Sequence, residues 1–412
     1  MKHSIMKHFL LFNASLGVVF LAASFFVPGA CAVDAKPAWE TPPGWTETRG
    51  GEGGKVLRVT TLAASGAGSL AEAIMTKGPR VIEFDVAGVI DLGGRSLKIA
   101  HSQVTISGET APSPGITLIN GGLGVTANDV IIRHLRIRPG AGKRAKKSGW
   151  EVDSLATNAA HDVIVDHCSI TWGTDENLSA SGPRFEGGTP DEWRKNTSHR
   201  ITFSHCIIGE GLHDSTHSKG PHSKGSLIHD NTSDIAILGN LYISNEDRNP
   251  LFKGGARGVV VNNLIQNPGR RVMQYALNAG EWKGKEWQRG AMVVIGNVAR
   301  RGPSIPSSTS FIDAKGPCDL HLHDNLYSDV SGAVLPVKVS DSESALLLVK
   351  EPPLWPSRLK AKPASETAAW VLSNAGARPW DRDDTDRRLV KEARAGGGKI
   401  IHHESEAGLG QR

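Results

Sequence analysis

The segment Val163-Ile164-Val165-Asp166-His167-Cys168 decides the fold, because its pattern returns at intervals along the chain. Each copy has alternating apolar residues, then His or Asn, and then a small or branched apolar residue. The other copies are residues 130–135, 201–206, 235–241, 259–264, 293–298 and 320–326. Their shared polar position is filled in turn by His134, His167, His205, Asn240, Asn263, Asn297 and Asn325, which lie 33, 38, 35, 23, 34 and 28 residues apart.

The spacing of these copies predicts a β-solenoid. A single coil cannot bury its own apolar face, whereas stacked coils bury a continuous core. The copies are rich in Val and Ile, with Gly and Asn at the bends, which is typical of strands separated by turns. The interval of 23 residues approximates one minimal coil. The longer intervals require loop insertions of about 5 to 15 residues.

We interpret the recurring His and Asn residues as a ladder inside the solenoid. Neighbouring coils are about 4.8 Å apart, so polar side chains at one inward bend can hydrogen-bond each other and the backbone. His134, His167 and His205 are therefore given a structural role and are not expected to be catalytic. Cys168 and Cys206 follow the ladder position on consecutive coils. A disulfide would fit there, but two buried thiols are favoured.

The first 32 residues have the pattern of a signal peptide. Lys2 and Lys7 precede an apolar stretch over residues 9–27, and the small residue Ala32 suits cleavage after it. A membrane anchor and a lipoprotein acceptor at Cys31 are the alternatives. The mature chain is expected to be secreted or periplasmic, with no membrane attachment after removal of this segment.

The composition excludes several classes of protein. With 39% apolar and 22% charged residues, the 412-residue chain is neither largely disordered nor a multi-span membrane protein. Its formal charge is +5, which falls to +3 when Lys2 and Lys7 are removed. This mild excess does not indicate nucleic-acid binding, but it permits an anionic partner. We expect a monomer.

The chain is predicted to contain one domain and a tail. Residues 33–335 would form the solenoid as a catalytic domain, and a short helix over 70–74, capped by Ser69, would close its open end. Residues 336–412 would form a tail whose helices over 365–375 and 384–394 pack along the outside.

Candidate functional residues follow from their distance to the ladder. Loop insertions on one face of a solenoid usually carry the function. Asp175 lies eight residues after His167, and Arg248 lies eight after Asn240. Both would then face the same side, two coils or about 10 Å apart. The stretch 172–177 offers the carboxylate and amide oxygens that Ca²⁺ prefers. Further candidates are Asp153 for metal and Trp172, Lys219, Lys224 and Lys253 for an acidic substrate.

Two of these segments resemble the pectate lyase family. The first is residues 163–169 followed by Trp172-Gly173-Thr174-Asp175-Glu176. The second is Arg248-Asn249-Pro250-Leu251-Phe252-Lys253, which is similar to the family's Arg-x-Pro-x-x-Arg catalytic segment. The resemblance implies an all-β fold, a right-handed parallel β-helix with an N-terminal capping helix and an outer C-terminal tail. It also implies β-elimination of polygalacturonate, an acidic polysaccharide.

The same resemblance implies roles for the two cations of the second segment. Arg248 matches the family's catalytic arginine and would act as the general base. Lys253 matches a second, substrate-binding arginine. Lysine keeps the positive charge but lacks the fork that binds a carboxylate through two hydrogen bonds.

A calcium site is implied in the same way. Asp153 and Asp175 match the first and last calcium ligands of the family. The family's middle ligand lies four residues before the last, where this chain has Thr171. Glu176 or Asn177 would have to supply the missing oxygen.

Three alternative functions remain open from the sequence. A pectin lyase-like enzyme would act on methylated substrate without metal. A polygalacturonase-type hydrolase needs two carboxylic acids flanking the glycosidic bond. The only adjacent aspartates, Asp383 and Asp384, fall in the predicted tail. A noncatalytic carbohydrate-binding solenoid would need no Arg-x-Pro segment.

Overall fold

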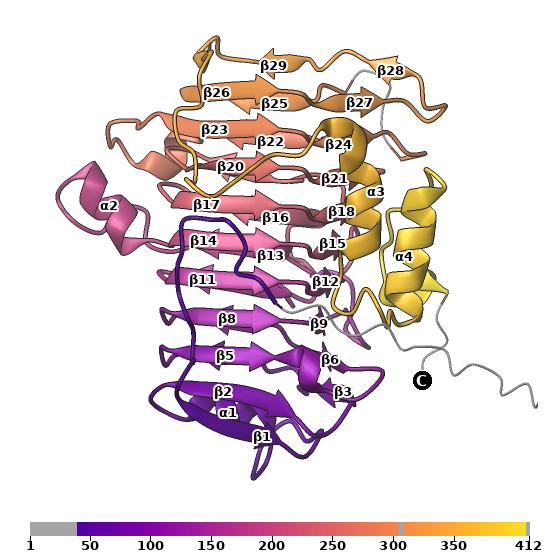
Figure 1. Ribbon diagram of the computed structural model, residues 1–412. Coiled ribbons are helices and arrows are strands. Elements are labelled where there is room, and N and C mark those ends of the chain that lie inside the picture. The colour runs from indigo at the N-terminus through magenta and orange to yellow at the C-terminus, as the bar shows by residue number, and fades with distance from the viewer. Residues whose placement is uncertain (1–38, 305–308, 409–412) are drawn as a thin grey trace, which may run out of the picture. The chain divides into compact units, whose positions relative to one another are not determined.

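The computed structural model describes residues 39–304 and 309–408, and the predicted signal peptide with Cys31 lies outside them. Between residues 55 and 348 the chain winds as a parallel β-helix, in which each full coil adds one strand to each of three sheets (Figure 1). One coil runs through β11 (His161–Asp166), β12 (Ser169–Thr171) and β13 (Glu176–Ser181). The predicted all-β fold, a right-handed parallel β-helix, is confirmed.

The three sheets are described here by their strand number. The 11-stranded sheet contains β1 (Lys55–Val59), β2 (Arg80–Phe84), β5 (Val104–Ser107), β8 (Val130–Arg133), β11, β14 (His199–Ser204), β17 (Ser233–Leu238), β20 (Arg257–Val261), β23 (Gly290–Ile295), β26 (Cys318–His323) and β30 (Leu346–Leu348). The 10-stranded sheet contains β3 (Gly88–Asp91), β6 (Ile116–Ile119), β9 (Leu135–Arg138), β12, β15 (Ile207–Gly209), β18 (Leu241–Ile243), β21 (Leu264–Gln266), β24 (Val298–Arg300), β27 (Leu326–Ser328) and β28 (Val334–Leu335). The 9-stranded sheet contains β4 (Leu97–Ile99), β7 (Leu123–Val125), β10 (Leu155–Asn158), β13, β16 (Lys224–Ile228), β19 (Leu251–Lys253), β22 (Met273–Ala276), β25 (Ile312–Lys315) and β29 (Val339–Asp341).

The core is a column of apolar side chains inside the coils. Val163 and Val165 of β11 are fully buried, and they lie in register with Ile201 and Phe203 of β14. Alternate residues of each strand therefore stack on the equivalent residues of the next coil, as the period of two predicts. This column extends from Val59 to Tyr327.

Two of the three sheets are also covered on their outer faces. Leu359 packs over the 11-stranded sheet together with Trp45 and Trp355. Helices α3 (Ala364–Asn374) and α4 (Asp384–Arg394) pack over the 10-stranded sheet, where Val371 and Leu389 are fully buried (Figure 1). The tail thus packs outside the β-helix as predicted, and its helices begin and end within one residue of the predicted positions.

An amide ladder runs through the interior, as the sequence predicted. Asn240 Nδ2 donates to Asn263 Oδ1 at 3.0 Å, Asn263 Nδ2 to Asn297 Oδ1 at 3.0 Å, and Asn297 Nδ2 to Asn325 Oδ1 at 3.1 Å. The first three of these side chains are fully buried. Each amide therefore satisfies polar groups of its neighbours that have no access to water.

The prediction that the histidines share this column is wrong by one residue. The strand register places His205 beside Gly239 and Cys206 beside Asn240. The Cys206 backbone N–H accordingly donates to Asn240 Oδ1 at 2.8 Å. There are thus two adjacent columns, one of Cys and Asn facing inward and one that contains the histidines. Cys168 and Cys206 are buried free thiols, as favoured from the sequence.

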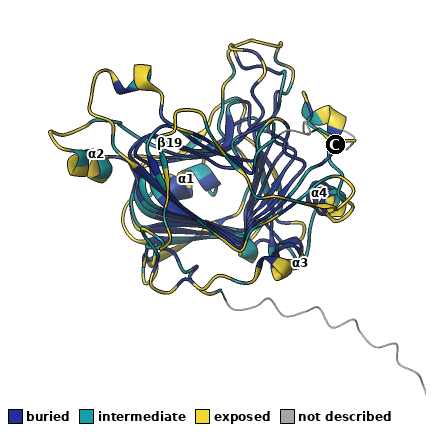
Figure 2. Cartoon of the chain, turned by 90° about the horizontal axis from the view of Figure 1, so that it is seen from above, coloured by how far each residue is buried: buried dark blue, intermediate teal, exposed yellow. Residues whose placement is uncertain are grey.

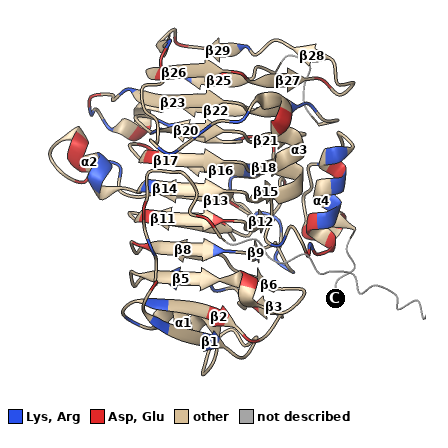
Figure 3. Ribbon diagram, viewed as in Figure 1, with Lys and Arg blue, Asp and Glu red and all other residues tan. Residues whose placement is uncertain are grey.

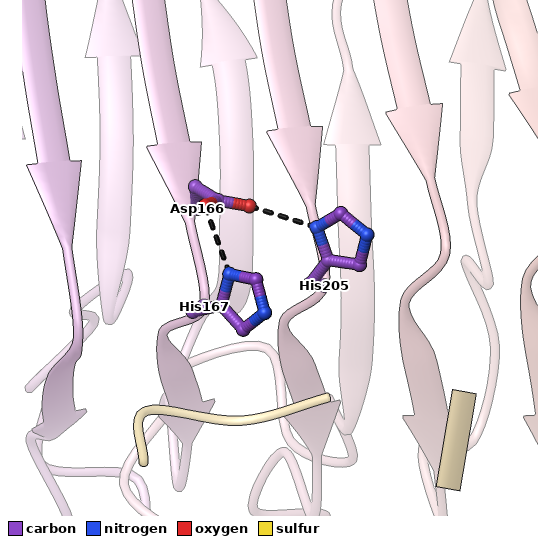
Figure 4. A group of neighbouring side chains, drawn as sticks. All are labelled: Asp166, His167 and His205. Atoms are coloured by element: carbon purple, nitrogen blue, oxygen red, sulfur yellow. Dashed lines mark hydrogen bonds and ion pairs between the residues drawn. The ribbon is translucent and has the colours of Figure 1, made fainter. Parts of the chain in front are cut away.

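The histidines form a stack, and a single carboxylate binds two of its three rings. The ring centroids of His134 and His167 are 5.1 Å apart, and those of His167 and His205 are 4.5 Å apart. Asp166 accepts hydrogen bonds from Nδ1 of His167 at 2.8 Å and of His205 at 2.9 Å (Figure 4). Trp39 Nε1 also donates to Asp166, at 2.9 Å. These contacts support the structural role predicted for the three histidines.

The two ends of the β-helix differ. Seen from above, helix α1 (Leu70–Met75) lies across the ring of strands (Figure 2), and it contacts β1, β2 and β4 at the start of the β-helix. The Ser69 side chain accepts from the Glu72 N–H as the N-cap of this helix. At the other end, β29 and β30 lie beyond residue 335 and still pair in parallel with β25 and β26. The domain boundary at 335 stays a prediction.

One further α-helix and three short 3₁₀ turns complete the described elements. Helix α2 (Pro190–Asn196) lies in the loop after β13, and short 3₁₀ turns occur at Gly108–Thr110, Ala279–Trp282 and Glu404–Ala407. None of the helices in the described part of the chain has both the length and the apolar content that crossing a bilayer requires.

Candidate active site

The candidate residues gather where strands of the 9-stranded sheet begin. Asp153 precedes β10, Glu176 begins β13, Lys224 begins β16, and Arg248 precedes β19. The register places Glu176 beside Lys224, and Lys224 beside Asp247 on the following coil. Glu176 and Arg248 are 72 positions apart in the sequence and two coils apart in the sheet, and their side chains are in direct contact.

Three carboxylates form the acidic part of this site. Oxygens of Asp153, Asp175 and Glu176 lie within 4.8 Å of one another. Asp153 Oδ1 also accepts the Glu176 backbone N–H at 3.0 Å, which fixes the two strands' side chains relative to each other. Burial, followed by the charge of Asp175, raises the pKa of Asp153 from 3.8 to about 7. The group therefore concentrates negative charge in a small, partly dry space.

Two histidines that the sequence did not single out complete this group. His222 Nε2 lies 2.8 Å and His217 Nε2 3.4 Å from Asp175 Oδ1. Their rings are stacked, with centroids 3.8 Å apart. Both come from the insertion between β15 and β16, whose path back to Asp175 follows no periodic pattern. No sequence signal could have found them.

Arg248 is held between the carboxylates and the next coil. Its guanidinium forms an ion pair with Glu176, and its backbone N–H donates to Gln274 Oε1 at 2.8 Å. The side chain is 23% exposed. Burial lowers the pKa of Arg248 below its usual value, although Asp175 and Asp153 act in the opposite direction. The structure thus brings Arg248 and the acidic group together on one side, as the sequence argument expected.

Lys253 lies at the far end of β19 within a second charged cluster. Its Nζ forms an ion pair with Glu281 and lies 3.5 Å from Asp230 Oδ2. Arg184, from the loop after β13, contacts the same two carboxylates at 2.6 and 3.0 Å. The sequence did not identify Arg184 or Glu281.

The other predicted binding residues have different surroundings. Lys224 pairs with the buried Asp247 at 2.9 Å. Trp172 donates to Glu210 at 3.0 Å and packs against Ala141, Leu212 and Ile401. Lys219 is exposed on the insertion that carries His217 and His222. Their roles in substrate binding stay predictions.

Of the two side chains expected to supply the missing oxygen, Glu176 lies in the three-carboxylate group and Asn177 does not. Asn177 donates to Asn245 Oδ1 at 3.0 Å in a second amide ladder and is fully buried. Thr171 lies on β12 in the 10-stranded sheet, and its hydroxyl is buried without a hydrogen-bond partner among the described residues. The three carboxylates lie at or just before the strands β10 and β13 of the 9-stranded sheet.

The adjacent aspartates of the tail are occupied by structural contacts. Asp383 accepts from the Asp386 backbone N–H as the N-cap of α4, and it pairs with Arg138 at 2.6 Å. Asp384 pairs with Arg387 at 2.6 Å. Figure 3 shows acidic and basic residues together on α4, which lies outside the 10-stranded sheet.

Comparisons with known proteins agree on one family. No family model matches the chain. "Probable pectate lyase C" of Neosartorya fischeri is 31% identical over 369 residues, covering 88% of this chain and 77% of that protein. The protein of the same name from Aspergillus flavus is 30% identical over 367 residues, covering 87% and 78%.

Solved structures show the same fold at lower identity. A mutant of Bacillus subtilis pectate lyase matches with a TM-score of 0.53 and 15% identity, over 82% of this chain and 97% of its own. The major allergen from cedar pollen matches with a TM-score of 0.52 and 17% identity, over 80% and 90%. A pectate lyase bound to a hexasaccharide matches with a TM-score of 0.52 and 14% identity, over 82% of this chain and 96% of its own.

The fold and these relatives define a polysaccharide lyase built on a parallel β-helix. The chain belongs to the pectate lyase family. The resemblance noted from the segments around Asp175 and Arg248 is thereby confirmed.

Proposed function

We propose that this protein cleaves polygalacturonate by β-elimination, with Arg248 as the general base. The observation that carries the proposal is the contact between Arg248 and Glu176, which places a guanidinium against the three-carboxylate group on one sheet. A structural neighbour is described as a pectate lyase bound to a hexasaccharide, and we extend an oligosaccharide substrate of acidic character to this chain.

The chemistry needs a base at the C5 proton of a uronate. Removing that proton leaves a pair of electrons that forms the C4–C5 double bond as the C4–O bond breaks, and the departing oxygen takes a proton. Arginine is ordinarily too basic, since its pKa exceeds 12. Burial lowers the pKa of Arg248, which is the direction that a base requires. Lys253 would bind an adjacent uronate carboxylate through its positive charge.

We also propose that Asp153, Asp175 and Glu176 hold a Ca²⁺ ion. Three carboxylates with ligand oxygens within 4.8 Å of one another suit the all-oxygen preference of this ion. Burial, and then the charge of Asp175, raises the pKa of Asp153 to about 7, and a bound cation would offset this cost of holding the carboxylate ionised. When bound, the ion would withdraw charge from the substrate carboxylate and stabilise an enolate-like intermediate. Thr171 contributes no ligand in this proposal.

Export to the periplasm or the medium completes the proposal. It rests on the signal-peptide pattern of residues 1–32 and on the size of the substrate, which is a polymer.

The decisive experiment measures products from polygalacturonate with added Ca²⁺ and with a chelator. Ultraviolet-absorbing unsaturated ends are expected. New reducing ends without this absorbance would instead indicate a hydrolase, and binding without either product would indicate a carbohydrate-binding solenoid. Activity that prefers methylated pectin and ignores the chelator would favour the metal-free alternative.

Variants test the assignment of the base. Arg248→Ala should lower kcat by roughly 10²–10⁴-fold, the range attributed to a general base. Arg58→Ala is the matched control, because Arg58 is 55% exposed on the first strand and pairs with Glu83 and Asp85, which are not part of the site. Full activity of Arg248→Ala would refute the role of this arginine.

A further inference from the structure

Two cations at the end of the 9-stranded sheet hold one carboxylate oxygen between them. Glu281 Oε2 lies 2.6 Å from Arg184 Nη2 and also forms an ion pair with Lys253 Nζ. Arg184 follows β13 and Lys253 ends β19, so the two cations come from coils that are two turns apart. Their convergence on a single oxygen is the geometry in which a protein binds a carboxylate.

Both cations also form ion pairs with a buried acid. Asp230 is fully buried, and its Oδ2 lies 3.0 Å from Arg184 Nε and 3.5 Å from Lys253 Nζ. Its other oxygen accepts from Trp282 Nε1 at 2.9 Å. The backbone of Arg184 is held as well, because Asn231 Nδ2 donates to its carbonyl at 2.9 Å. The cations therefore keep their positions whether or not Glu281 is present.

The charges of this cluster leave room for one anion. Arg184 and Lys253 contribute two positive charges and Asp230 one negative charge. His229 adds none at neutral pH, since burial lowers its pKa to about 4. The remaining single positive charge is neutralised by Glu281, and one uronate carboxylate would neutralise it equally well.

We propose that Arg184 and Lys253 form a binding subsite for a uronate carboxylate of the substrate, which the Glu281 side chain fills in this structure. The inference rests on the proposed function and deepens it. Lys253 alone lacks the guanidinium fork, and Arg184 supplies it from a different loop. Glu281 is then an internal competitor that the substrate displaces.

The placement of Glu281 allows this exchange. Its side chain is 33% exposed, whereas that of Lys253 is 12% exposed and that of Asp230 is fully buried. It lies on the 3₁₀ turn Ala279–Trp282, which the buried Trp282 anchors. Rotation of the Glu281 side chain alone opens the subsite while the turn stays in place. The subsite is also close to the base, because Lys253 is five residues from Arg248, at most about 17 Å along an extended chain.

The test measures binding of a saturated oligogalacturonate by calorimetry in the Arg248→Ala background, where the ligand is not consumed. Adding Glu281→Gln keeps the shape of the side chain and removes the competing charge, so Kd should fall roughly threefold to tenfold. Adding Arg184→Ala should raise Kd about tenfold or more, and Arg184→Lys should recover part of this loss. Lys195→Ala, an exposed cation on α2 of the same loop, should leave Kd unchanged.

The fully methyl-esterified oligosaccharide separates a carboxylate subsite from a general effect. Its affinity should respond to neither Glu281→Gln nor Arg184→Ala. In the active enzyme, Glu281→Gln should lower KM with kcat nearly unchanged, which a purely structural ion pair would not do. An unchanged or higher Kd for Glu281→Gln, in a protein that cleaves polygalacturonate, overturns the subsite and leaves the proposed function standing. A wild-type protein that neither cleaves nor binds the acid oligosaccharide overturns the proposed function itself.

Discussion

The interior amide ladder offers a sharp test of what holds the coils together. Asn263→Leu replaces a fully buried amide by an apolar side chain of similar size. The change removes the oxygen that accepts from both the backbone N–H and the Nδ2 of Asn240, at 2.8 and 3.0 Å. It also removes the donor to the Ile237 carbonyl at 2.9 Å.

The expected loss follows from counting the groups left without partners. Two N–H groups of Asn240 and the Ile237 carbonyl lose a hydrogen bond in a space closed to water. The Val261 carbonyl and Asn297 Oδ1 also lose the Asn263 amide, but they keep the backbone N–H groups of Gly239 and Asn263 as donors. Each such group contributes about 1–3 kcal/mol, and the added apolar burial of leucine offsets part of the sum. We expect the free energy of unfolding to fall by about 4 kcal/mol.

The control is the same substitution at the end of the ladder. Asn325 accepts from Asn297 at 3.0 and 3.1 Å but is only half-buried, so water can replace it and Asn325→Leu should lose about 1 kcal/mol. Urea titrations of the three proteins give the comparison, and hydrogen exchange of the Asn240 amide gives a local readout. An equal fall in the free energy of unfolding at both positions would refute the argument that hydrogen bonds closed off from water stabilise the ladder most.

Three more predictions concern charged groups. Burial lowers the pKa of His134 from 6.5 to about 3, so its contribution to stability is complete above pH 6.5 and is lost as the pH falls toward 3. Between pH 6.5 and 5, the free energy of unfolding should therefore fall by about 2 kcal/mol less in His134→Asn than in the wild type, as measured by urea titrations. An unchanged pH profile would contradict this. Asp175→Asn should weaken calorimetric Ca²⁺ binding about tenfold or more, whereas equal affinity would place the ion elsewhere. Arg138→Met leaves the buried Asp386 without its 2.8 Å partner and should lower the free energy of unfolding by about 3–5 kcal/mol, with partial recovery in the double variant with Asp386→Asn.

The sequence predicted the fold well because the fold is a repeated local pattern. Strands such as β11 and β14 carry the same alternation of apolar residues, and stacking is the way for each to bury that face. The register between the coils was harder to predict from the sequence. The copy at Asn240 has Gly239 where earlier copies have His, and both residues lie at a bend, so the sequence could not distinguish the two adjacent columns.

The sequence predicted only those site residues that lie beside the repeating strands. Asp175, Glu176 and Arg248 lie at a fixed position relative to the strands, and the sequence could bring them to one side. Their partners come from insertions, whose paths no periodicity describes. His222 and Glu281 are such cases, since each reaches its partner by folding back over the sheet.

The position of the site follows from which surfaces the chain itself covers. The tail helices bury the outer face of the 10-stranded sheet, and Leu359 with Trp45 covers the 11-stranded sheet. The 9-stranded sheet instead carries charged residues at both ends of its strands, from Glu176 to Lys253. A long acidic polymer needs an extended surface with cations held in place at regular steps, and coils about 4.8 Å apart supply such steps. The same stacking that buries the core therefore spaces the charges that would hold the substrate.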